Sequence, residues 1–207
     1  MLVTAIIPTV DGRQGHLAHC LGALANQPYD MELIVLRDRP TCGAAWAEGA
    51  RESRGDYIAF LADDLYVNPG YFAAMIAAVD AGMCPSAVVY EPGPVLQSAG
   101  IQGWDCYRPD KLTDWAPVEH TTTPFMSRAQ WDVVAEHAHF LSSLHYCSDM
   151  LVSAALSRSG VPVVVRTAAS AVHYNATIGR GAGMGQHTRT AHDRAAFARY
   201  FAPEEAA

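Results

Sequence analysis

Short apolar runs alternate with helical patterns over the first hundred residues of the chain. Residues 2–7 (LVTAII) form an apolar run that ends at Pro8. Between residues 17 and 24, apolar side chains recur at i, i+3, i+4 and i+7, which is the spacing of one helical face. A short, continuous apolar run is typical of a strand that is buried on both faces. The pattern therefore predicts a strand followed by a helix.

The same pairing of a strand signal with a helix signal occurs twice more. Residues 31–36 (MELIVL) and 57–62 (YIAFLA) are apolar runs, and an alanine-rich stretch at 43–53 lies between them. After the second run, Asn68 suits the cap of a helix and Pro69 its first position. The order βαβαβα favours a parallel sheet with helices packed over it.

The second half of the chain is less regular, and the glycine-rich stretch 174–187 fits no regular element. The expected strands are 86–90, 95–101, 124–127 and 162–166. One helix is expected to end near His137, a second to begin at Ser148 and a third to span 188–201.

Composition narrows the function classes. The 207 residues include 14 Lys and Arg against 21 Asp and Glu, a net charge of −7, which disfavours general binding to a nucleic-acid backbone. The five cysteines form no Cys-x-x-Cys pair, so neither structural zinc nor a disulfide framework is supported. The N-terminal apolar run is too short for a signal sequence and no run approaches the length of a membrane span, so we expect a cytoplasmic protein.

Acidic residues follow each of the first three predicted strands: Asp11, Asp38, and the pair Asp63 and Asp64. In a parallel sheet these strand ends share one edge, where ligands bind. Four carboxylates there repel one another unless a cation lies among them. The pattern predicts a divalent metal with a phosphate ligand, although Asp11 and Asp38 as helix caps, with the pair leading into a turn, fit the spacing equally well.

Four segments together resemble the family 2 glycosyltransferases of the GT-A fold. They are VTAIIPTVDGR, ELIVLRD, ARESRGDYIAFLADDLYVNPGYF and SDMLVSAALSRSGVPVVVR, and the resemblance covers residues 2–175. It implies an α/β fold with a mostly parallel central sheet and helices on both faces. It also implies inverting transfer of a hexose from a nucleoside-diphosphate sugar, with a UDP-sugar expected, to an acceptor hydroxyl with Mn²⁺ or Mg²⁺ as cofactor.

The resemblance assigns nucleotide-binding roles to residues after the first two strands. Pro8 and Thr9 match the segment along the nucleobase, and Asp11 follows in the same loop. Asp38 matches an acid that accepts a hydrogen bond from the uracil or the ribose. Taken without the family, Pro8 is equally well explained as a strand terminator.

The resemblance places the metal at the end of the third strand. Asp64 matches the metal-binding acid and Asp63 its neighbour near the ribose, while Ala62 replaces the leading acid of the family motif. His173 lies where enzymes of this fold often complete the metal shell. A histidine at a strand end is also commonly a simple surface residue.

The resemblance assigns Asp149 as the base that takes the proton of the acceptor hydroxyl. Without the family, an acid this close to a helix start is expected to stabilise the helix dipole. The glycine-rich segment 176–186 is expected to close as a lid over the diphosphate, with Arg180 contributing positive charge.

The chain is expected to form a single domain, 1–207, with a nucleotide-binding half (about 1–100), an acceptor and catalytic half (about 101–187) and a C-terminal helix (about 188–201). The residues leave open whether the acceptor is a glycan, a lipid-linked sugar, a protein or a modified nucleic acid. Two other functions stay open: a catalytically impaired nucleotide-sugar binding module and a sugar-1-phosphate nucleotidyltransferase.

Overall fold

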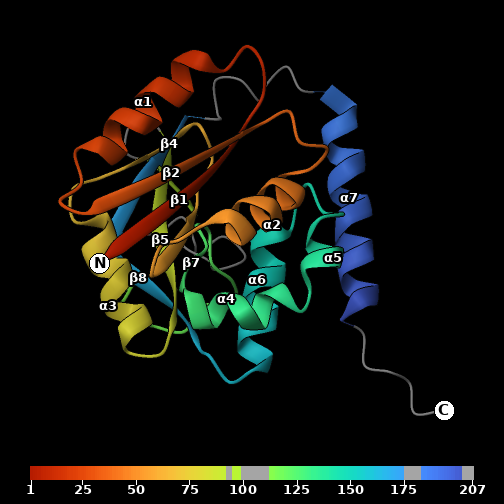
Figure 1. Cartoon of the computed structure of the whole chain (residues 1–207). Helices are drawn as coiled ribbons and strands as arrows, with labels where there is room; N and C mark the ends of the chain where they lie inside the picture. The colour runs from red at the N-terminus through yellow and green to blue at the C-terminus, as the bar shows by residue number, and fades with distance from the viewer. Residues whose placement is uncertain (92–94, 99–111, 175–182, 202–207) are drawn as a thin grey trace.

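The computed structural model describes residues 1–91, 95–98, 112–174 and 183–201. The strands are β1 (Leu2–Thr9), β2 (Asp30–Arg37), β3 (Tyr57–Phe60), β4 (Leu65–Val67), β5 (Cys84–Glu91), β6 (Val95–Ser98), β7 (Phe125–Ser127) and β8 (Val163–His173). The helices are α1 (Gln14–Ala25), α2 (Cys42–Glu52), α3 (Tyr71–Asp80), α4 (Arg128–Ala135), α5 (Ala138–Leu141), α6 (Ser148–Arg158) and α7 (Gly183–Tyr200). Figure 1 shows the strands at the centre, with helices on both sides of them.

The strands form two sheets of four, in the orders β2-β1-β3-β7 and β4-β8-β5-β6. In the first sheet β1 is parallel to β2 and β3, so that Ile6 lies opposite Ile34 and Phe60. In the second sheet β5 is parallel to β8, whereas β4 and β6 pair antiparallel with their neighbours. The predicted α/β class with parallel strands is confirmed, and antiparallel strands extend both sheets.

The two faces of β1 supply two hydrophobic cores. Successive side chains of a strand point to opposite faces. Ala5 and Ile7 accordingly pack in a cluster that includes Phe72 of α3, whereas Ile6 belongs to a second cluster with Trp46 of α2. Helices on both faces therefore bury the apolar runs that the sequence pattern identified.

The segment after α5 packs tightly against the start of α2. The amide of Gly43 donates to the carbonyl of Leu144 at 2.9 Å. A Cβ atom added at Gly43 would lie 1.9 Å from the carbonyl oxygen of Leu141, so a larger residue would force the two segments apart. This contact fixes the chain that leads into α6.

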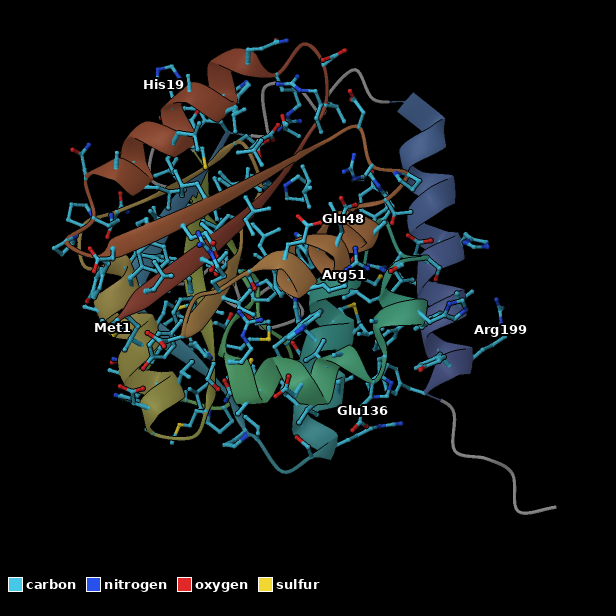
Figure 2. All side chains as sticks on the ribbon, viewed as in Figure 1. Met1, His19, Glu48, Arg51, Glu136 and Arg199 are labelled. Carbon is cyan, nitrogen blue, oxygen red and sulfur yellow. The ribbon has the colours of Figure 1, made fainter. Side chains whose placement is uncertain are left out.

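Helix α7 lies along the side formed by α5 and α6 (Figure 1). Its last turn stacks Tyr200 on Phe140 at 4.0 Å between ring centroids, and the Tyr200 hydroxyl lies 3.0 Å from Nδ1 of His137. On the other side of the helix Arg199 projects outward (Figure 2). The helix begins at Gly183, so the prediction that 183–187 is irregular was wrong. Glycine weakens a helix by only about 1 kcal/mol per residue, and tertiary docking overrides that preference.

Two short elements were not expected from the sequence, namely β4 and α5. Strand β4 pairs with the end of β8, which places Leu65 opposite His173. Strand β8 itself continues to His173, well past the predicted end at 166, after a register irregularity opposite Ala87 and Val88. Strand β4 and helix α5 are each only three or four residues long, and each lies next to a longer predicted element, so nothing in the sequence pattern separates it from that neighbour. None of the helices in the described parts of the chain is long and apolar enough to cross a bilayer.

Candidate active site

A cavity of about 410 Å³ opens at the carboxyl ends of β1 and β3. Its walls come from the loops after β1, β2 and β3, the start of α2 and the segment before α6. The lining residues are Pro8, Thr9, Val10, Arg13, Leu36, Arg39, Thr41, Cys42, Trp46, Leu61, Ala62, Asp63, Asp64, His145, Tyr146 and His173. We call it the strand-end cavity.

Asp63 and Asp64 form a buried acidic pair in the turn between β3 and β4, with side chains only 6% and 3% exposed. Arg13 bridges them, because its Nη2 lies 2.7 Å from Oδ1 of Asp63 and 2.5 Å from Oδ2 of Asp64. The Thr9 hydroxyl donates to Oδ2 of Asp63 at 2.7 Å, and Nε2 of His173 lies 3.0 Å from Oδ1 of Asp64. Residues from β1, the turn after β3 and the end of β8 thus meet at one point.

These partners keep Asp64 ionised. Burial by itself raises the pKa of this carboxyl, but the hydrogen bond and charge of His173, together with the charge of Arg13, outweigh burial and lower the pKa to about 2. Asp64 is therefore negatively charged throughout the physiological range.

The side chains around Asp64 carry the types of atom that bind a divalent cation. Asp64 offers carboxylate oxygens and His173 an imidazole nitrogen, both of which Mn²⁺ accepts. No three His, Cys, Asp or Glu side chains in the described part of the chain are grouped to hold a metal ion by themselves. Two protein ligands are typical, however, where substrate phosphates complete the shell. The guanidinium of Arg13 shows that a positive group fits between the carboxylates.

A second cavity of about 240 Å³ adjoins the first, and the two share Trp46, Ala62 and His173 as walls. We call it the inner cavity. Asp149 and His120 line it, together with Phe60, Leu65, Val89, Thr122 and Thr123. The predicted base Asp149 therefore lines one cavity and the predicted metal ligand Asp64 the other, while His173 belongs to the wall that the two cavities share.

Asp149 lies at the start of α6 and lines the inner cavity. Desolvation raises the pKa of its carboxyl, and only the charge of His120 and backbone N–H groups, such as that of Met150 at 2.8 Å, oppose the rise. Nδ1 of His120 is buried without a hydrogen-bond partner among the described residues. The inner cavity thus contains an acid whose proton affinity is increased and a histidine nitrogen with an unused hydrogen-bonding position.

The turn before α6 is held by α7. Cys147 caps α6 with φ of 63°, a left-handed conformation that is uncommon for a residue other than glycine. Just before it, the amides of His145 and Tyr146 donate to Oδ2 of Asp193 at 2.9 and 2.8 Å. Asp193 is fully buried, so its carboxylate fixes the chain that positions Asp149.

The structure does not bring every predicted residue to the strand-end cavity. Asp11 and Asp38 do not line it: the Asp11 side chain is 80% exposed and pairs with Arg37 at 2.9 Å, and the Asp11 amide donates to Asp38 at 3.3 Å. Asp11, Asp38 and Arg37 thus contact one another on exposed loops outside the cavity. Arg180 and most of the predicted lid lie outside the described residues.

The sequence prediction missed three residues of the site: Arg13, His120 and Asp193. Arg13 comes two residues after Asp11 in the loop that was already identified, so its place opposite Asp63 and Asp64 follows once β1 and β3 are paired. His120 and Asp193 lie in an irregular segment and on the C-terminal helix, and no local pattern connects either with Asp149.

Comparisons with known proteins agree on the fold. The crystal structure of S. aureus TarS superposes with a TM-score of 0.63 at 13% identity, over 84% of this chain and 37% of TarS. A crystal structure of GalNAc-T7 with UDP, GalNAc and Mn²⁺ gives 0.63 at 10% identity, over 84% of this chain and 43% of that one. S. aureus TarS 1-349 in complex with UDP-GlcNAc gives 0.58 at 13% identity, over 83% of this chain and 58% of that one.

The chain thus spans less than half the length of the first two proteins. No curated protein sequence matches it significantly. The likeness confirms the predicted GT-A architecture. A sequence profile of glycosyl transferase family 2 matches residues 6–129, which include Arg13, Asp63, Asp64 and His120. That match covers more than half of the chain, which therefore belongs to glycosyl transferase family 2.

Proposed function

We propose that the chain is an inverting, metal-dependent glycosyltransferase that moves a hexose from a UDP-sugar to an acceptor hydroxyl. The observation that carries the proposal is the contrast between the two adjoining cavities. One contains a carboxylate held in its charged form, and the other contains an acid whose pKa is raised. A transferase needs both, because it must hold a charged leaving group and accept a proton.

The strand-end cavity is the proposed donor site. Pro8 and Thr9 lie at its edge on the first strand, and Thr9 orients Asp63 for contact with the ribose. Asp64 and His173 would hold the metal, which when bound neutralises charge that develops on the departing diphosphate. We leave Asp11 and Asp38 out of the proposed donor site because they do not line the cavity.

Asp149 is the proposed base. The acceptor oxygen forms a bond to the anomeric carbon while the bond from that carbon to the diphosphate oxygen breaks, so the centre inverts. The acceptor proton passes to Asp149. A raised pKa favours this role because a base works best when its pKa lies nearer to the operating pH.

UDP is proposed as the nucleotide because the similar solved structures include complexes of TarS with UDP-GlcNAc and of GalNAc-T7 with UDP and Mn²⁺. The resemblance of the sequence to family 2 enzymes supports the same choice. The acceptor hydroxyl would enter through the inner cavity, where Asp149 lies.

The test is release of nucleoside diphosphate from a panel of UDP-, GDP- and TDP-hexoses, with water as the acceptor, in the presence of Mn²⁺ or EDTA. We expect slow release from one UDP-hexose that stops with EDTA and in Asp149→Asn. Binding of the sugar nucleotide without release would identify a binding module. Formation of a UDP-sugar from UTP and a sugar 1-phosphate, with release of pyrophosphate, would identify a nucleotidyltransferase.

A further inference from the structure

Arg13 is the one cation that joins both members of the acidic pair in the described part of the chain. It lies at the end of the loop between β1 and α1, and its side chain is 24% exposed to the strand-end cavity. The guanidinium donates from Nε to Oδ2 of Asp63 at 3.0 Å, while its Nη2 reaches both carboxylates. Arg13 thus contacts both acids and the cavity.

The four carboxylate oxygens of the pair are all engaged. The two oxygens of Asp63 accept from Thr9 and Arg13, and those of Asp64 contact Arg13 and His173. A divalent cation needs at least one carboxylate oxygen of Asp64. Arg13 keeps its positive charge and has no atom that can bind a metal, whereas His173 is itself a proposed ligand, so Arg13 is the partner that must give way.

Burial limits when Arg13 can leave. Two adjacent carboxylates that are almost fully buried need a compensating cation, because an unpaired buried charge is strongly destabilising. Arg13 therefore holds the pair until another cation replaces it.

We propose that Arg13 is an exchangeable counterion, which neutralises Asp63 and Asp64 in the absence of metal and moves to the diphosphate of the donor when the metal binds. The inference rests on the proposed function, since it takes the metal site at Asp64 and His173 as given. It makes binding of metal and donor interdependent: the bare metal must compete with Arg13, whereas a metal that arrives with a diphosphate supplies Arg13 with a new anionic partner.

The chemistry of the arginine side chain suits the exchange. A guanidinium has five N–H donors in a planar fork that match phosphate oxygens as well as carboxylates. Because Arg13 already lines the cavity, its guanidinium can turn toward a ligand that enters there.

The experiment measures Mn²⁺ binding by EPR, with and without UDP, in the wild type and in Arg13→Gln. We expect Arg13→Gln to bind Mn²⁺ without nucleotide roughly tenfold more tightly than the wild type, and UDP to raise its Mn²⁺ affinity by a smaller factor. The matched control is Arg39→Gln, which removes another positive charge from the same cavity. Arg39 pairs with Glu48, a residue on α2 labelled in Figure 2, and in the absence of nucleotide this variant should keep the wild-type Mn²⁺ affinity.

Loss of Arg13 leaves the acids unpaired, so a second variant and a second measurement guard against poor folding. Arg13→Lys keeps the charge but cannot span both carboxylates with a planar fork, and its Mn²⁺ affinity should fall between the other two. Addition of Mn²⁺ should also raise the melting temperature of Arg13→Gln more than that of the wild type.

Unchanged or weaker Mn²⁺ binding by Arg13→Gln, with Mn²⁺ and UDP still bound together by the wild type, would overturn the exchange and make Arg13 a fixed structural partner. Failure of the wild type to bind Mn²⁺ even with UDP would instead overturn the metal site of the proposed function, and the exchange with it. Asp64→Asn separates these outcomes from binding elsewhere, because it should abolish Mn²⁺ binding in both backgrounds.

Discussion

Asp64 and Asp149 line adjoining cavities of the same fold, yet their surroundings shift the pKa values of the two carboxyls in opposite directions. Asp64 lies between an arginine and a histidine, which lower the pKa of its carboxyl to about 2. At Asp149 the charge of His120 and the backbone N–H of Met150 do not outweigh desolvation, which raises the pKa of the carboxyl. Desolvation raises the pKa of both carboxyls, so the opposite net shifts come from their partners.

The contrast shows how one site can contain two carboxylates with different tasks. A carboxylate that stays charged at every working pH is suited to hold a cation, whereas one with a raised pKa is suited to accept a proton. The two carboxyls have different partners, so a variant can change the pKa of one without replacing a partner of the other.

The largest expected effect follows from Asp149→Asn. Its amide keeps the shape of the side chain but not its basicity, so we expect turnover to fall by about 10²–10⁴-fold, with donor affinity nearly unchanged. At pH 7 the melting temperature should hold or rise, because the raised pKa means that the folded state disfavours the charged carboxyl once the pH exceeds its unfolded value of about 3.9.

Turnover, donor affinity and melting temperature should be measured on the same preparation. A lower melting temperature with normal turnover per folded molecule would make Asp149 a helix-stabilising residue and remove the base from the proposed function.

The opposite pattern is expected for Asp64→Asn. Donor affinity in the presence of Mn²⁺ should fall by more than about 100-fold, since loss of even an outer partner of a metal ligand commonly costs 10–100-fold. Asp63→Asn should have a smaller effect, because Asp63 contacts Thr9 and Arg13 without the histidine. Calorimetric titration of UDP into each protein in the presence of Mn²⁺ measures these affinities. Equal UDP affinities for the wild type, Asp64→Asn and Asp63→Asn would place the metal elsewhere.

Asp64→Asn should also lower stability, and the effect should depend on pH. The lowered pKa of Asp64 stabilises the fold above the unfolded value of about 3.9, and this contribution is lost as the pH falls toward about 2. The melting temperatures of the variant and the wild type, without metal, should therefore differ at pH 7 and converge near pH 2.

A moderate effect is expected from Asp193→Ala. The variant leaves the amides of His145 and Tyr146 without their acceptor, which should lower the free energy of unfolding by about 1–3 kcal/mol. Turnover should fall as well, because the same segment leads into α6. Urea unfolding measures the first quantity, with Arg199→Ala, at an exposed position of the same helix (Figure 2), as the control. Equal unfolding midpoints for the two variants would contradict the positioning role of Asp193.

The smallest expected effect is a shift in pH dependence. The positive charge of His120 lowers the pKa of Asp149, so His120→Gln should move the acidic limb of the pH–rate profile toward higher pH. His19→Gln, on the exposed face of α1 (Figure 2), is the control that should leave the profile in place. A profile shifted toward lower pH in His120→Gln would reverse the assigned interaction.

Much of the fold was predictable because its first half follows simple periodicity. The apolar runs at 2–7, 31–36 and 57–62 became β1, β2 and β3, and the carboxyl ends of β1 and β3 meet at the cavity as the parallel pairing requires. Strand β4 was not predicted, because its three residues directly follow the acidic turn after β3 and show no separate pattern. The helical start of α7 was missed because glycine content indicated a loop, whereas the packed helix tolerates it.

For the candidate site, the sequence predicted the acids but not what neutralises them. Asp63, Asp64 and His173 are brought together, as are Thr9 and Pro8 at the edge of the cavity. Asp11 and Asp38 were expected there because they follow strands, but their loops turn outward. Local sequence patterns indicate the element on which a side chain lies but not its contacts across the fold. The contacts of Arg13, His120 and Asp193 could therefore be identified only from the three-dimensional structure.

The pairing of Asp193 with two amides has a consequence for how the protein can be observed. Those two N–H groups exchange with solvent deuterium only when the carboxylate of Asp193 withdraws, so their protection measures how often α7 lifts from the body of the protein. His145 and Tyr146 both line the strand-end cavity. Two amide signals at the strand-end cavity would therefore report local opening of a helix that begins almost forty residues farther along the chain.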